Sequence, residues 1–333
     1  MLSPKENFFR TLSGDIPEYV PSRFDPYLRP FQEELLTPNN LPDGQPFVTS
    51  LGVTYVGCRE ANNGAMPKPG EIVISDITKW RDQLKILNEM PGHWEQALAD
   101  RDWEGYYKSF LDKVDREKTA VSVSGGDYFL TLVSLLGFEN TMLAMMEEPE
   151  EVHALLTEIS EFYLFVMKKE LQYMKPDVFN LMDDDAAFLC PFFSVDTYRE
   201  IFKPFHKMHC DLALENGCRL LRHDCGKSEQ FVDDWLELGI EAWNPFQVSN
   251  DCKRIKKEYG DRLTLDGAWD GVSVLNYSDD ELIAALDEYS ATFLPGGRFI
   301  FSASAGFLLG DEHRAGVIRD YYENNVRYYY RYH

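Results

Sequence analysis

His223 and Cys225 stand two positions apart at the end of a predicted strand and could together bind a metal ion. The run of residues 218–222 is strand-like and leads directly into the tetrapeptide His223–Gly226. If the strand continues to Cys225, the imidazole and the thiol point the same way, because alternate side chains of a strand share a face. Nitrogen and sulfur ligands of this kind suit zinc, which activates a bound atom as a Lewis acid or by lowering its pKa. The alternative is a buried cysteine beside a hydrogen-bonded histidine.

Acidic residues follow two other predicted strands. The triplet Asp183–Asp185 comes directly after the run 177–182, and Asp266 and Asp270 flank a short turn after the run 263–266. Three consecutive acids repel one another, so one or two of them could have a raised pKa or bind a cation. The alternatives are a solvated turn or helix cap for the triplet and an ordinary strand-to-loop turn for the other pair.

Strand-like and helix-like runs alternate from about Thr119 onward. Ser194 is a predicted N-cap, and Ser278 and Glu281 have the spacing of a capping box. Segments 20–24 and 47–50 could supply further strands upstream. The predicted strands are 120–126, 177–182, 219–221, 240–243, 263–266 and 299–302, and the predicted helices are 148–174, 194–216, 228–238, 252–259, 278–292 and 313–328.

This alternation predicts an α/β fold with a parallel sheet, and we favour a (β/α)8 TIM barrel. In a barrel, the polar residues that follow the strands meet at one face, where active sites are built. A doubly wound open sheet is the competing architecture. It would require a Gly-x-Gly-x-x-Gly turn after a strand, and the sequence contains none.

Composition restricts the classes of partner. The chain has 333 residues and a formal net charge of −23, which argues against nucleic acid and anionic membranes as partners. No run approaches the ~18 apolar residues of a membrane span. The six cysteines form no Cys-x-x-Cys pair, and the N-terminus has no basic region followed by an apolar one. Together these features predict reduced thiols in a cytoplasmic protein.

Several segments, taken in order and spacing, resemble the uroporphyrinogen decarboxylase superfamily in its corrinoid-dependent methyltransferase branch. The resemblance implies one barrel domain over residues 1–333, with about 1–118 forming an N-terminal segment and insertions packed on the barrel. The segments that carry it are Lys5–Asp15, Tyr19–Pro21, Leu136–Asn140, Glu147–His153, Pro176-Asp177 followed by Asp183-Asp184, Phe202–Phe205, His223-x-Cys225-Gly226, Gly239–Pro245 and Tyr259–Arg262.

Two departures from the family pattern affect the expected chemistry. The arginine-rich Met-Arg-Gln-Ala-Gly-Arg stretch that binds porphyrin carboxylates in the decarboxylases has no match, so we do not expect uroporphyrinogen as substrate. Related methyltransferases add a third zinc-binding cysteine near the last strand, and Ala305 occupies that position here. A third ligand would then come from Asp184, our first choice, or from its neighbour Asp183.

The resemblance implies transfer of a methyl group from a small donor, for which we favour a methoxylated aromatic, to the cob(I)alamin of a separate corrinoid protein. Zinc would be held by His223, Cys225 and Asp184. A methylamine, betaine or methylthiol donor is the alternative within this reaction. Outside it, the alternatives are a metal-independent decarboxylase of a smaller substrate and a non-catalytic barrel that binds a ligand or a corrinoid protein.

Further residues complete the predicted site. We expect Asp184, Asp183 and Asp270 to be catalytic. Asp266 and two N-terminal aromatics, Phe24 and Tyr27, are the predicted substrate-binding residues, although such aromatics could simply cover the barrel. The tyrosine-rich segment Tyr328–His333 could pack on the barrel or form a homodimer contact.

Overall fold

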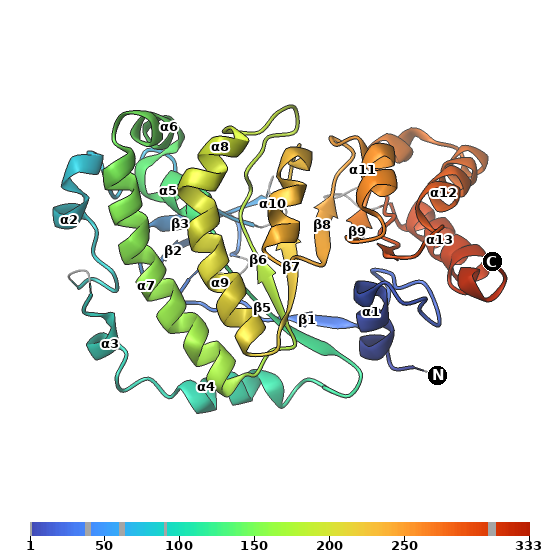
Figure 1. Ribbon diagram of the computed structural model, residues 1–333, viewed down its shortest axis with the longest axis horizontal. Coiled ribbons are helices and arrows are strands. Elements are labelled where there is room, and N and C mark those ends of the chain that lie inside the picture. The colour runs from blue at the N-terminus through green and yellow to red at the C-terminus, as the bar shows by residue number, and fades with distance from the viewer. Residues whose placement is uncertain (1, 37–40, 60–63, 90–91, 306–310) are drawn as a thin grey trace.

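The computed structural model describes residues 2–36, 41–59, 64–89, 92–305 and 311–333. Its centre is a curled parallel sheet, with helices outside and a small antiparallel sheet at one side (Figure 1). The helices are α1 Pro4–Ser13, α2 Trp80–Gln83, α3 Trp94–Ala97, α4 Trp103–Leu111, α5 Tyr128–Leu136, α6 Phe138–Glu147, α7 Pro149–Tyr173, α8 Val195–Thr197, α9 Lys203–Glu215, α10 Val232–Glu237, α11 Cys252–Tyr259, α12 Asp279–Phe293 and α13 Glu312–Tyr321.

The described part of the parallel sheet contains seven strands in the order β1-β5-β6-β7-β8-β9-β10. From β5 onward, each strand pairs with the next strand along the chain, as expected for successive β/α units. The strands are β1 Leu28–Pro30, β5 Ala120–Gly125, β6 Val178–Leu181, β7 Arg219–His223, β8 Ala242–Phe246, β9 Thr264–Gly267 and β10 Phe299–Ile300. The predicted α/β barrel with parallel strands is confirmed.

One N-terminal segment contacts both edges of this sheet. Ser22 forms an isolated parallel bridge with Phe301 just beyond β10, and a few residues later β1 pairs with β5. The predicted strand 20–24 is therefore reduced to a single bridge. Pro21 has no N–H to donate, which limits the ladder on that side. The bridge lies between β10 and β1, where the eighth strand of a barrel would lie.

Helix α1 covers the amino-terminal end of the barrel. Its Phe8 and Leu12 are buried in one cluster with Ala120, Val178 and Ala242, which stand at the beginnings of β5, β6 and β8. On the outer surface, α7 packs on β5 and α9 packs on β6 and β7 (Figure 1). The apolar face of α7 is buried along its length, as its sequence spacing predicts.

The predicted helix caps are confirmed, but one long helix is interrupted. Ser194 accepts a hydrogen bond from the Thr197 amide, and Ser278 and Glu281 form the predicted capping box. The expected helix 194–216 changes to a π-helical turn at Tyr198–Phe202 before α9 begins. Pro204 lacks the N–H that an α-helical bond would need here, which accounts for the irregular turn.

The strand predicted at 47–50 lies outside the barrel. It forms β2 (Pro46–Val48), which pairs antiparallel with β3 (Thr54–Cys58), and β3 pairs with β4 (Gly64–Pro67). A short turn joins β2 to β3, so β2 pairs with the strand that follows it directly in the chain. No single helix of the described residues has both the length and the apolar composition of a membrane span, although α5 and α6 pass that test together with a 111° bend between them.

Candidate metal centre

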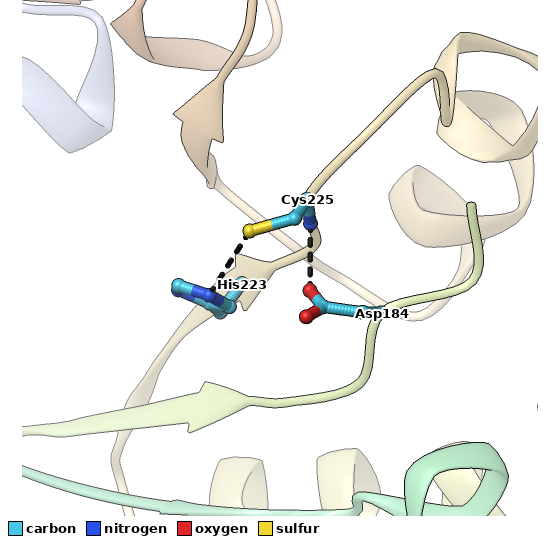
Figure 2. A group of neighbouring side chains, drawn as sticks. All are labelled: Asp184, His223 and Cys225. Atoms are coloured by element: carbon cyan, nitrogen blue, oxygen red, sulfur yellow. Dashed lines mark hydrogen bonds between the residues drawn. The ribbon is translucent and has the colours of Figure 1, made fainter. Parts of the chain in front are cut away.

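Three side chains meet at the carboxyl ends of two neighbouring strands (Figure 2). His223 is the last residue of β7, Cys225 follows it, and Asp184 comes from the segment after β6. Their ligand atoms all lie within 4.8 Å of one another. The Cys225 sulfur is 3.7 Å from His223 Nε2, and the Cys225 amide donates to Asp184 Oδ1 across 2.8 Å. All three residues are partly exposed, so a ligand can reach them.

The donor set of this group suits zinc. One nitrogen, one sulfur and one carboxylate oxygen can supply the three protein ligands of a zinc site with an open position. Burial, and then the charge of Asp184, raise the pKa of the Cys225 thiol well above its usual value. A divalent cation offsets both effects, because a coordinating thiol is deprotonated. In the described part of the chain, this is the one group of three such residues close enough to hold a metal ion.

A buried ion cluster holds the two ligand-bearing segments together. Arg222, Asp185 and Asp224 are all fully buried. The Arg222 guanidinium donates to Asp185 across 2.5 Å and also to Asp224, while the Asp185 amide donates to Asp224 across 3.2 Å. Burial raises the pKa of Asp185 to about 7, against the opposing charge of Arg222. Each carboxylate lies next to a candidate ligand in the chain, so the cluster fixes the spacing of the ligands.

The turn after Cys225 leaves no space for a larger residue at Gly226. Gly226 has φ of +84°, and a Cβ placed on it would lie 2.3 Å from the Ala186 carbonyl oxygen. Its amide donates to Gln247 Oε1 across 2.9 Å. Glycine at this position therefore lets the loops after β6 and β7 approach each other.

Asp183 is directed to a different partner from Asp184. Its carboxylate accepts hydrogen bonds from the amides of Phe129 at 2.8 Å and Leu130 at 3.0 Å, in the first turn of α5. Its φ of +153° is rare for a residue other than glycine. Burial raises the pKa of Asp183 to about 6, although Arg222 and these amides lower it. Of the two aspartates considered as third ligand, only Asp184 joins His223 and Cys225.

Two predicted substrate-binding residues line a cavity of about 260 Å³ inside the barrel, which we call the lumen cavity. Tyr27 stacks on Phe8 with ring centres 4.5 Å apart, and Asp266 accepts hydrogen bonds from Asn244 at 2.8 Å and from Ser302. Burial raises the pKa of Asp266, against these hydrogen bonds. Both predicted residues thus line the same cavity.

The lumen cavity is lined by residues of the strands next to the proposed metal ligands. Leu221 lines it, and His223 is the next residue of β7 that faces the same way. Asn244 also lines the cavity and pairs in register with His223 on the neighbouring strand. Sequence reasoning missed Asn244, Asn180 and Arg23. A usable signal was Asn180, a polar residue within the apolar predicted strand 177–182.

The remaining two predicted residues lie elsewhere. Phe24 packs against Tyr322 at 5.7 Å between ring centres and lies beneath the Arg319 guanidinium. Asp270 accepts hydrogen bonds from the amides of Val272 and Ser273 in the loop after β9. Burial alone would raise the pKa of Asp270, but the hydrogen bonds from Ser273 and Val272 lower it. Neither residue lines the lumen cavity.

Comparison with known proteins places the chain in a family. Residues 108–313, more than half of the chain, match the family model for uroporphyrinogen decarboxylase (URO-D). The fold is similar to that of a methyltransferase from Methanosarcina mazei, with a TM-score of 0.59 and 13% identity over 97% of this chain and 100% of that chain. No curated protein sequence gives a match. The chain belongs to the uroporphyrinogen decarboxylase family.

Proposed function

We propose that this protein is a zinc-dependent methyltransferase that moves a methyl group from a small donor to the cob(I)alamin of a separate corrinoid protein. The observation that carries the proposal is the convergence of Asp184, His223 and Cys225 at the carboxyl-terminal face of the barrel. Membership of the uroporphyrinogen decarboxylase family and a fold shared with a methyltransferase support it. We favour a methoxylated aromatic as the donor.

The residues around the triad suit the cleavage of a methyl ether. Cob(I)alamin is a strong nucleophile, so the difficult part is departure of the oxygen, which needs a Lewis acid or a proton. Zinc, when bound by His223, Cys225 and Asp184, would supply Lewis acidity. In this proposal the lumen cavity holds the ring of the donor between Tyr27 and Asp266. Burial raises the pKa of Asp266, whose carboxyl is held in place by hydrogen bonds from Asn244 and Ser302.

The remaining predicted residues take different parts in this proposal. Asp183 positions the segment that carries Asp184 by binding the first turn of α5, instead of contacting the donor. Phe24 supports the segment that leads to Tyr27. The catalytic role of Asp270 stays a prediction from the sequence resemblance.

The test measures methyl transfer and metal content together. Purified protein is incubated with reduced cobalamin and a panel of methoxyarenes, and the loss of the cob(I)alamin absorbance is followed. Zinc is quantified by elemental analysis. We expect about one zinc per chain and transfer from at least one methoxyarene. Cys225→Ala should lose the bound zinc and the methyl transfer while keeping its melting temperature. Cys190→Ala, at an exposed cysteine, should keep the zinc and the transfer.

Three outcomes would overturn the proposal. Unchanged zinc content in Cys225→Ala would exclude Cys225 as a ligand. Release of CO2 from a small acid by metal-free protein would favour the decarboxylase alternative. Zinc-loaded protein that transfers no methyl group from any tested ether, amine, betaine or thiol would favour a binding protein.

A further inference from the structure

A second cavity of about 290 Å³ opens at the carboxyl-terminal face of the barrel, and we call it the mouth cavity. The loop after β1, the antiparallel sheet, α5 and α7 all contribute to its lining. Asp127, which lines it, directly follows the glycine pair at the end of β5. Asp127 follows β5 and Asp184 follows the neighbouring strand β6, so this cavity opens at the same face of the barrel as the candidate metal centre.

The carboxylate of Asp127 is left without its usual partners. Asp127 is the N-cap residue of α5, and such a side chain normally accepts from the second or third amide of its helix. Those amides belong to Phe129 and Leu130, and both already donate to Asp183. Asp127 accordingly makes no capping bond, and its half-buried carboxylate faces the cavity.

The other polar groups of the lining supply no positive charge. None of the described residues that line the mouth cavity is lysine, arginine or histidine. The hydroxyl of Tyr163 forms a hydrogen bond with the Thr131 hydroxyl at 2.8 Å, and the hydroxyl of Tyr55 forms one with Ser134. Burial, and then the charges of Asp183 and Asp184, raise the pKa of Asp127 to about 7, against the charge of Arg222, which does not line the cavity, and a hydrogen bond from the Asp127 amide. A ligand with a positive charge would supply what the lining lacks.

We propose that the mouth cavity binds an organic ammonium group, with the Asp127 carboxylate as counter-ion and the rings of Tyr55 and Tyr163 beside it. Aromatic rings and a carboxylate together recognise substituted ammonium ions. The inference rests on the proposed methyl transfer and narrows its donor. The donor is an aromatic methyl ether that carries an amine, and donors that carry a carboxylate are rejected by Asp127.

The test is a binding measurement that requires neither metal nor corrinoid. Benzyltrimethylammonium, benzyl alcohol and benzoate, which share a ring and differ in charge, are titrated calorimetrically into the full-length protein. We expect the cation to bind at least about tenfold more tightly than the alcohol, and benzoate to bind more weakly than both. Equal affinities for the three probes would overturn the inference.

Matched variants locate the binding to this cavity. Asp127→Asn keeps the side-chain shape and should weaken cation binding at least about tenfold, whereas Glu34→Gln, at an exposed carboxylate on the neighbouring loop, should not. Tyr163→Phe keeps the ring and should retain binding, whereas Tyr163→Leu should weaken it. Loss in Glu34→Gln equal to that in Asp127→Asn, at unchanged melting temperatures, would place the cation elsewhere.

The same experiments separate this inference from the proposed function. Cys225→Ala should still bind the cation, because the triad does not contact it. Methyl transfer from neutral methoxyarenes without cation binding would support the proposed methyltransferase and contradict the ammonium site. Cation binding without any methyl transfer would support the ammonium site and contradict the proposed methyltransferase.

Discussion

The guanidinium of Arg222 lies 2.5 Å from the carboxylate of Asp185, and both side chains are fully buried. This contact joins strand β7 to the segment after β6. Asp184 precedes Asp185 in the chain, and His223 follows Arg222. The pair therefore sets the distance between two proposed zinc ligands without itself contacting the metal.

Arg222→Met tests this relationship. Removal of one partner of a buried ion pair leaves uncompensated charge, so we expect the free energy of unfolding to fall by about 3–5 kcal/mol. Without Arg222, the folded protein would hold Asp185 and Asp224 more easily in their protonated, uncharged form. The loss of unfolding free energy should therefore be smaller at pH 5 than at pH 8. Chemical denaturation at both pH values measures this. Arg199→Met, at a half-exposed arginine that pairs with Asp234, is the control and should cost no more than about 1 kcal/mol.

The two neighbouring aspartates should respond in opposite ways to loss of charge. Asp184→Asn keeps an oxygen for the Cys225 amide but removes a charged ligand, so zinc affinity should fall by at least about 10–100-fold with little change in melting temperature. Asp183→Asn weakens the cap of α5 and should lower the free energy of unfolding by about 1–2 kcal/mol. Zinc titration and thermal melts measure both. The same zinc affinity in Asp184→Asn and the wild type would contradict the assignment.

Gly226→Ala should disturb the turn that carries Cys225. The added Cβ would lie 2.3 Å from the backbone of Ala186 at a positive φ, so the loops must separate. We expect a loss of about 1–3 kcal/mol in stability together with weaker zinc binding. Gly316→Ala in α13 is the matched control, because nothing lies within 4 Å of its added Cβ. That change should stabilise the protein by about 0.5–1 kcal/mol and leave the zinc affinity unchanged.

His209 should make the protein less stable in acid. Burial, and then the charge of His206, lower its pKa from 6.5 to about 3. Between these values the unfolded chain binds a proton that the folded chain does not. His209 therefore lowers the free energy of unfolding as the pH falls below 6.5, by up to about 1.4 kcal/mol for each pH unit.

His209→Gln measures this contribution. Its stability should fall less steeply than that of the wild type between pH 6.5 and pH 4. Exposed His93 provides the control, and His93→Gln should follow the wild-type slope. Parallel slopes for all three proteins would show that His209 takes up its proton without unfolding.

The sequence alone determined the features that depend on local periodicity. The spacing of His223 and Cys225 predicted that their side chains would lie close together, although β7 ends at His223 and Cys225 lies just beyond the strand. The succession of strands and helices determined the parallel sheet. Local chemistry was also sufficient for the caps at Ser194 and Ser278, because a cap and its partner lie within one turn. These predictions required no contact between distant parts of the chain.

The tertiary structure decided the choices that depend on distant contacts. The sequence could not separate Asp183 from Asp184, because the amides that bind Asp183 belong to α5, more than fifty residues away in the chain. The same contact leaves the Asp127 carboxylate without a cap partner, and no local pattern singled out that residue. The segment at 46–48 forms a strand as expected, but pairing with β3 places it outside the barrel. Periodicity determines which way a side chain faces, whereas its partner is determined only when the chain folds.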